Sequence, residues 1–378
     1  MTARWRGATL ALFALGLLAA LAGLYWSPRR AWSNLLLVEV YALGLALAAA
    51  LFLCIHHLTG AGWSSGLRRV PEAMMGSLPV LALLALPLMA ARPVLFPAAV
   101  AVDEGAPGAK ALFQGAPLVF VRSGLALLAW VLLARALRRL SLRQDTHPDL
   151  ATHRRLVRVS AVFVPVFAFT LTLACVDWLM ALAPEWTSTA FTVYVFSGLL
   201  VSGLAALTLI VIVLRARGVL SDVVRADHLH DLGKLIFTFC TFWAYIWLSQ
   251  YLLIWYADLP EEIPHYARRT EAPWTVPFLV NLAVNWAIPF VVLLGREAKR
   301  SPRVLAAVCV LLLCGRWLDL YLLIMPETMG APGLGPLELL LPLGFASLFA
   351  FLTARALAQA PLVPLGDPFL GESLRHHT

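Results

Sequence analysis

The stretch YIWLSQYLLIWYADLPEE, from Tyr245 to Glu262, decides the fold class of this chain. Most of its residues are apolar or aromatic, yet it carries the amide of Gln250 in mid-run and ends on three carboxylates, Asp258, Glu261 and Glu262. Such a run is typical of a helix that crosses a bilayer and leaves it through an aromatic belt. The fold class depends on whether the pattern repeats.

The pattern repeats along the whole chain. Of its 378 residues, 61% are hydrophobic and 13% are charged, whereas a soluble chain carries about 25% charged residues. The first apolar run lacks a small-residue cleavage site, which favours a retained helix over a signal peptide. We expect an all-α polytopic membrane protein, one integral membrane domain over residues 1–378, with ten spans at 7–26, 35–57, 74–100, 113–137, 156–183, 189–214, 231–257, 274–295, 303–325 and 337–360.

The basic residues indicate the orientation. With ten spans both termini share one side, and that side holds 21 of the 29 Lys and Arg residues, against 6 on the other side. The positive-inside rule therefore predicts cytoplasmic termini. The net charge of +8 then follows from topology and attraction to anionic lipid, so we expect no nucleic-acid partner.

Cofactor signatures are lacking in the sequence. It has no CxxCH, no iron–sulfur cysteine set and no mid-span His, so we expect no metal, haem or cluster bound by this chain. The cysteines all lie in apolar runs without a CxxC pair, which predicts small buried hydrophobic residues: Cys54, Cys175, Cys240, Cys309 and Cys314.

Polar residues inside the spans are the primary site candidates, because a charge in the membrane is by default a functional hypothesis. Spans that run toward the cytoplasm carry their charged residues in the first third, and spans that run outward carry them in the last third. All of these residues therefore fall in the outer half of the membrane. The candidates for a proton pathway or quinone-proximal site are Glu39, Arg122, Asp177, Gln250, Tyr256, Asp258, Arg316 and Asp319.

Structural alternatives exist for several of these residues. Arg316 and Asp319 share a helix face at i and i+3 and could neutralise each other. Arg122 could form a buried pair with Glu39 or with Asp177. Both interpretations remain open at the level of the sequence.

A purely structural role is hardest to assign to Asp177, because residues 178–180 continue its apolar run for another turn. Gln250, Ile254 and Asp258 follow the spacing i, i+4, i+8, which predicts that the amide and the carboxylate face one side. The alternative for Asp258 is a solvated helix end.

A second polar group lies on the cytoplasmic side, around the second connection and before the span 231–257. Histidines and carboxylates there could take up protons, or they could be ordinary solvated loop residues. The candidates are His56, His57, Glu72, His228, Asp231 and Lys234.

One short internal similarity is visible. ACVDW, from Ala174 to Trp178, resembles LCGRW, from Leu313 to Trp317, and four spans separate the two. That spacing suggests two related four-helix units.

Five ordered segments resemble the F subunit of alternative complex III, the bacterial quinol:cytochrome c oxidoreductase, a relative of the polysulfide-reductase-type (NrfD-like) membrane subunits. They run from the second to the ninth span: GAGWSSGLRRVPEAMMGSLP (Gly60–Pro79), CVDWLMALAPEWTSTAFTVYVFSG (Cys175–Gly198), HDLGKLIFTFCTFWAYIWLSQYLLIWYADLPEE (His230–Glu262), NWAIPFVVLLGREAKR (Asn285–Arg300) and RWLDLYLLIMPE (Arg316–Glu327).

The resemblance implies two four-helix bundles, about 35–183 and 189–325, with the first and last spans peripheral, in the bacterial inner membrane. It implies partner subunits that carry haem c and iron–sulfur clusters, a paralogous C-type membrane subunit, and a possible quinone, menaquinone or ubiquinone. Glu39 and Arg122 lie outside the matched segments, whereas the other outer-half candidates lie within them. Two positions depart from the family pattern, since an acidic residue is usual at Ala183 and a His is common near Asn285.

These observations lead to one functional expectation and two alternatives. We expect a subunit of a respiratory oxidoreductase that passes electrons from quinol to cytochrome c or another high-potential acceptor, in which Asp177 accepts a proton and passes it outward. The alternatives are an ion-coupled secondary transporter and a purely structural anchor. The transporter is disfavoured because no pair of broken, Gly-rich helices marks a midplane site.

Overall fold

The fold is described from a computed structural model that covers residues 3–97 and 115–377. These residues are 82% helical, and no strand occurs in the two ranges. Within them, ten helices are long and apolar enough to cross a membrane. The expected all-α polytopic membrane protein is therefore confirmed.

Each of the ten predicted spans corresponds to one observed helix or helix pair. Residues 98–100 of the third predicted span and 113–114 of the fourth lie outside the described residues. The observed spans are Arg4–Trp26, Pro28–Thr59, Arg69–Ala90, Ala116–Thr146, Leu150–Leu182, Phe191–Ala216, Ala226–Ala257, Thr275–Leu293, Pro302–Thr328 and Pro336–Leu357.

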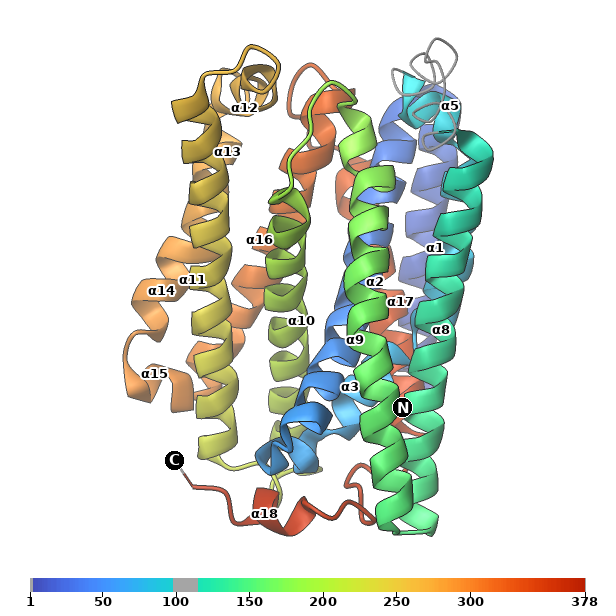
Figure 1. Cartoon of the computed structure of the whole chain (residues 1–378), viewed down its shortest axis with the longest axis vertical. Coiled ribbons are helices and arrows are strands. Elements are labelled where there is room, and N and C mark those ends of the chain that lie inside the picture. The colour runs from blue at the N-terminus through green and yellow to red at the C-terminus, as the bar shows by residue number, and fades with distance from the viewer. Residues whose placement is uncertain (1–2, 98–114, 378) are drawn as a thin grey trace.

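The helices follow one another in the order shown in Figure 1. They are α1 (Ala3–Trp26), α2 (Pro28–Thr59), the 3-10 helix η1 (Gly62–Leu67), α3 (Arg69–Met75), α4 (Leu78–Ala90), α5 (Arg92–Leu95), α8 (Ala116–Thr146), α9 (Leu150–Trp178), the 3-10 turn η2 (Met180–Leu182), α10 (Phe191–Ala216), α11 (Ala226–Ala257), α12 (Ile263–Thr270), α13 (Thr275–Leu282), the π-helical turn η3 (Ala283–Ala287), α14 (Ile288–Leu293), α15 (Arg296–Arg300), α16 (Pro302–Thr328), α17 (Pro336–Leu357) and α18 (Leu370–Leu374).

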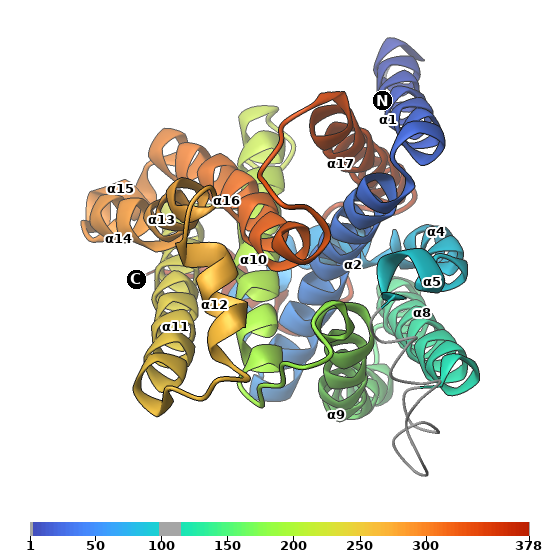
Figure 2. The ribbon, with the colours of Figure 1, turned by 90° about the horizontal axis from the view of Figure 1, so that it is seen from above.

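Helices α2 and α10 form the centre of the molecule and pack on each other. On one side α2 also packs with α4 and α9, and α8 packs with both of these. On the other side α10 packs with α11 and α16, and α13 and α14 complete that group. Seen from above in Figure 2, α1 lies at the edge of the molecule and packs on α17.

Two spans are interrupted. The third span breaks at Gly76 and Ser77 between α3 and α4, with Pro79 in the first turn of the new helix, where its missing N–H is tolerated. The eighth span contains the π-helical turn just before Pro289. If the two four-helix units are compared, these breaks fall at non-equivalent positions, the second helix of one unit and the third of the other.

The two termini lie at the same end of the molecule, which we call the terminal face (Figure 1). The connections that follow α8, α10 and α14 also lie at this face, whereas α5 and α12 lie at the opposite end, which we call the α12 face. The terminal face therefore collects the basic connections that the sequence analysis grouped on one side.

Candidate functional site

An ion pair joins α8 to α9 near the α12 face. Arg122 Nε donates to Asp177 Oδ2 at 2.6 Å, and Arg122 Nη2 donates to the other carboxylate oxygen. One residue further along both helices, Trp178 Nε1 donates to Ser123 Oγ at 3.0 Å. Of the two partners that the sequence allowed for Arg122, the structure selects Asp177.

Among the buried acids, Glu39 on the neighbouring helix α2 differs from Asp177 in its hydrogen-bond partners. Its exposed fraction is 2%, and neither carboxylate oxygen has a hydrogen-bond partner among the residues that the structure describes. It lines a small cavity of about 40 Å³ together with Arg92, Ser123 and Asp177. Ionising an isolated buried carboxylate is unfavourable, so the group requires water or a proton inside this cavity.

Three small cavities lie in a row through this region. An outer one of about 70 Å³ is lined by Arg122, Asp177 and Trp186. Asp177 also lines the cavity of Glu39, and Trp178 lines both that cavity and a third one of about 30 Å³, which reaches Arg316. Each has room for water, since a buried water requires about 10–15 Å³ of such volume and two to four polar partners.

A central polar cluster stands at the inner end of the row. The Asp319 carboxylate accepts from the Arg316 guanidinium and the Tyr194 hydroxyl, and Asn281 Nδ2 donates to it at 3.1 Å. Asn285, within the π-helical turn, donates to the Gly315 carbonyl at 3.0 Å. The expected pairing of Arg316 with Asp319 is therefore present, and α10 and α13 contribute to it as well.

The remaining outer-half candidates do not join this row. Gln250 is buried, donates to Ser188 Oγ at 3.1 Å and lines none of the three cavities. Tyr256 is 86% exposed. Asp258 ends α11 with φ 50° and is exposed, while its backbone N–H still donates to the Ile254 carbonyl. Its position agrees with the alternative of a solvated helix end.

A further cluster near α12 was not predicted. Glu327 accepts from Arg268 and, at 3.0 Å, from the buried Arg269, while the ring of His265 stacks on Trp186 with centroids 3.7 Å apart. Burial and the two neighbouring guanidinium groups hold the pKa of His265 well below its usual value. The only signal in the sequence was the Arg268–Arg269 pair in a connection.

The residues that the sequence analysis placed on the cytoplasmic side, as candidates for proton uptake, fall into three separate groups. His56 contacts the Phe52 carbonyl at 2.7 Å, and His57 contacts Ser160 Oγ at 3.0 Å. Glu72 forms ion pairs with Arg68 and Arg69 in a buried network.

The third of these groups belongs to a helix. The predicted span 231–257 left His228 outside the helix, but α11 begins at Ala226 and includes His228 together with Asp231 and Lys234. The helix starts early because the His228 ring accepts the Arg225 backbone N–H at 3.2 Å as an N-terminal cap.

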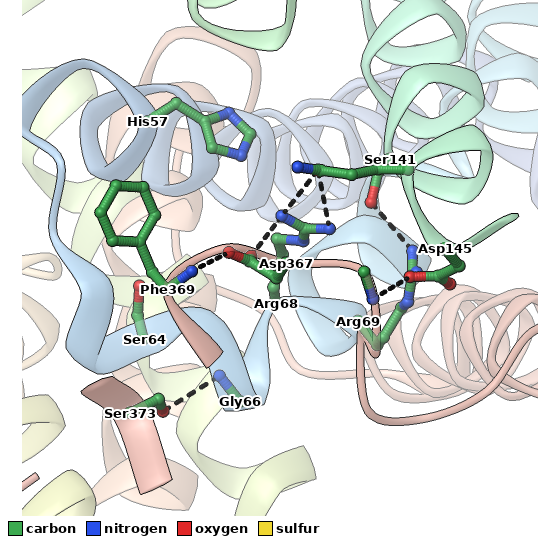
Figure 3. Close-up of polar contacts among 12 residues, drawn as sticks. His57, Ser64, Gly66, Arg68, Arg69, Ser141, Asp145, Asp367, Phe369 and Ser373 are labelled. Atoms are coloured by element: carbon green, nitrogen blue, oxygen red, sulfur yellow. Dashed lines mark hydrogen bonds and ion pairs between the residues drawn. The ribbon is translucent and has the colours of Figure 1, made fainter. Parts of the chain in front are cut away.

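The C-terminal tail, residues 358–377, crosses the terminal face (Figure 1). Asp367 pairs with Arg68, and Ser373 Oγ donates to the Trp63 carbonyl at 2.7 Å and accepts from the Gly66 N–H (Figure 3). The same hydroxyl contacts His228 at 3.3 Å. The tail thus connects the segment that follows α2 with the start of α11.

The cysteines are buried as expected, with one exception. All five are free thiols, and Cys314 is exposed on α16, so its predicted burial is wrong. The reason is geometric, because its neighbours Gly315 and Arg316 occupy the inward face at this level of the helix.

The fold and these clusters define a multi-pass, all-α membrane protein with ion pairs buried inside its helical bundle. No protein-family model and no curated protein matches the chain. Within residues 3–97 and 115–377 no group of three or more His, Cys, Asp or Glu side chains is arranged to hold a metal ion.

Proposed function

We propose that this chain is an integral membrane subunit of a bacterial respiratory complex that oxidises quinol and reduces cytochrome c or another high-potential acceptor. In this proposal it conducts protons through the half of the membrane next to its α12 face, which would lie outside the cytoplasm. The sequence segments from Gly60 to Glu327 support the type of complex. The row of cavities supports the role in proton transfer.

One observation carries the proton role. Glu39 is a buried acid without a partner in the described chain, and it faces a cavity that Asp177 also lines. A purely structural acid in a membrane interior normally pairs with a cation or a hydrogen-bond donor. An acid that keeps both oxygens directed at a water-sized space is suited to hold and release a proton.

In this proposal each residue has a separate role in proton transfer. Quinol oxidation releases two protons and two electrons, and haem c and iron–sulfur clusters of partner subunits would take the electrons. Glu39 accepts a proton that quinol releases and that water in its cavity relays, and Asp177, oriented by Arg122, passes it to the outer cavity. The Arg316–Asp319 cluster closes the inner end, where its ion pair opposes leakage of protons toward the cytoplasm.

The test uses the whole complex, purified from native membranes and reconstituted into vesicles. Glu39→Gln and Asp177→Asn preserve shape but remove the titrating group, so the rate of quinol oxidation, and of the proton release that accompanies it, should fall roughly tenfold or more. Asp222→Asn, at an exposed carboxylate of the α10–α11 connection, is the matched control. If both variants assemble and release protons like the unmodified complex, the proton role is wrong and the structural anchor remains.

The type of complex is tested separately. Purification of the tagged chain in a mild detergent should recover subunits with haem c absorption bands and iron–sulfur clusters. Recovery of the chain alone and colourless would contradict the respiratory complex and favour the transporter. The two interrupted spans do not favour a transporter, because repeat-based transport sites place such breaks at corresponding positions of the two halves.

A further inference from the structure

The largest described cavity lies away from the site above. It has a volume of about 400 Å³ and runs between α10 and α17, with α2 behind it. On α17 every third or fourth residue from Pro342 to Leu357 lines it, and on α10 the same spacing holds from Ala206 to Arg217. Two complete helix faces therefore form opposite walls of one groove.

The groove is long for its volume. The residues from Pro342 to Leu357 span roughly 22 Å at 1.5 Å per residue, and the cavity volume along them is about 400 Å³. A long, thin group such as a single extended hydrocarbon chain fits this shape.

The walls of the groove are suited to such a chain. Ala346, Ala350 and Ala354 succeed one another at intervals of four on α17, and the first two are exposed, so the small side chains leave the space open. Leucine, isoleucine, valine and phenylalanine side chains form most of the remaining lining. An alkyl chain in the groove is held by van der Waals packing against these side chains, since bilayer hydrocarbon is as apolar as the groove itself.

The polar groups of the groove gather at the terminal face. Arg217 lines its mouth at the end of α10 and is exposed, and its guanidinium has no ion-pair or hydrogen-bond partner in the described part of the chain. Trp5 lies at the same end, where aromatic residues mark a membrane interface. One turn inside the mouth, the Thr353 hydroxyl is 2% exposed and lacks a hydrogen-bond partner within the described residues.

We propose that this groove binds one acyl chain of an anionic phospholipid, with the lipid phosphate at Arg217 and the ester group at Thr353. A guanidinium at the mouth complements an anionic head group, because its hydrogen bonds to phosphate are charge-assisted on both sides, whereas a neutral quinone carbonyl supplies no opposite charge. The polar end also lies at the terminal face, far along the helices from Arg122 and Asp177. The inference is independent of the proposed function.

The experiment measures lipid bound to the delipidated, full-length chain in detergent by native mass spectrometry. Phosphatidylglycerol is the anionic probe and phosphatidylcholine the zwitterionic one. The unmodified chain should retain one phosphatidylglycerol with a clear preference over phosphatidylcholine. Arg217→Gln should lower that preference about fivefold, which corresponds to about 1 kcal/mol for one arginine beside an anionic surface.

Matched variants separate the groove from the rest of the surface. Ala350→Phe fills the groove and should reduce phosphatidylglycerol binding at least tenfold, whereas Leu343→Phe, at an exposed position of α17 outside the groove, should leave it unchanged. Arg215→Gln removes a neighbouring charge outside the lining and serves as the control for Arg217. Equal losses in Arg215→Gln and Arg217→Gln, or binding that survives Ala350→Phe, would overturn the proposal. A quinone in place of phospholipid in the extracted protein would overturn it too.

Discussion

The buried acids of the membrane interior differ in their partners. Asp177 and Asp319 each accept from an arginine, whereas Glu39 has no partner among the described residues. Removal of one member of a buried ion pair typically destabilises a protein by about 3–5 kcal/mol because it leaves a charge uncompensated. Asp177→Asn therefore combines a functional and a structural effect, whereas Glu39→Gln leaves no cation behind and reports more directly on proton transfer.

At the residue scale His265 provides a prediction about pH. Its pKa in the folded chain lies well below the value of about 6.5 expected when unfolded, because it is buried and faces Arg268 and Arg269. Between these two pKa values the unfolded state binds one more proton than the folded state. The free energy of unfolding should therefore fall by about 1.4 kcal/mol for each pH unit below about 6.5, and recover above it.

The measurement is thermal or denaturant unfolding in detergent micelles between pH 7.5 and pH 5. Replacement of His265 by Gln should reduce the slope over this range, since glutamine does not titrate. The comparison isolates His265 from the nearby Glu327 carboxylate, which both proteins retain. Identical slopes for the two proteins would contradict the assignment.

Single residues were predictable only where their chemistry conflicted with their surroundings. Asp177 and Arg122 stand out because a charge interrupts an apolar run. Arg68 and Asp367 carry no such signal, since they lie outside the apolar runs and are 299 residues apart. Only the folded chain brings such groups together.

At the element scale, the contact between α2 and α10 depends on one small residue. A Cβ atom added at Gly203 would lie well inside van der Waals contact with the Cβ of Ala48. We expect Gly203→Ala to destabilise the chain by about 1–3 kcal/mol through overpacking. Gly124→Ala is the control, because nothing lies within 4 Å of its added Cβ, and it should leave the melting temperature in detergent unchanged or slightly raised.

The predicted spans identified every long helix but underestimated most lengths. Hydropathy marks the part of a helix inside hydrocarbon, whereas the backbone continues into the polar interface until a cap or a turn ends it. α2 thus begins at Pro28 rather than near residue 35, and α11 begins at Ala226. The π-helical turn was not predictable, because it depends on hydrogen bonds from Asn285 to another helix.

At the scale of the whole molecule, the common end of the two termini follows from an even number of spans. The orientation itself follows from the basic residues, which predict that the terminal face lies in the cytoplasm. Green fluorescent protein fused after Thr378 should fluoresce in a bacterial host, and alkaline phosphatase inserted at Glu261 should be active. The reverse pattern would show the opposite orientation.

The two four-helix units that the internal similarity and the family resemblance suggested stay a prediction. The lipid-sized groove and the C-terminal tail could not be predicted. The groove depends on alanine spacing across three helices, and the tail has no periodic pattern that would connect it to η1 or α11.

The tail also imposes an order on biosynthesis. Ser373 follows all ten hydrophobic segments along the chain, yet its hydroxyl contacts Trp63, Gly66 and His228, which are synthesised before it. All ten hydrophobic segments can be inserted before these contacts exist. A nascent chain that stops before Ser373 would therefore be fully inserted, but Gly66 and His228 at its terminal face would lack this hydroxyl. Membrane proteases could recognise that face as the mark of an unfinished chain.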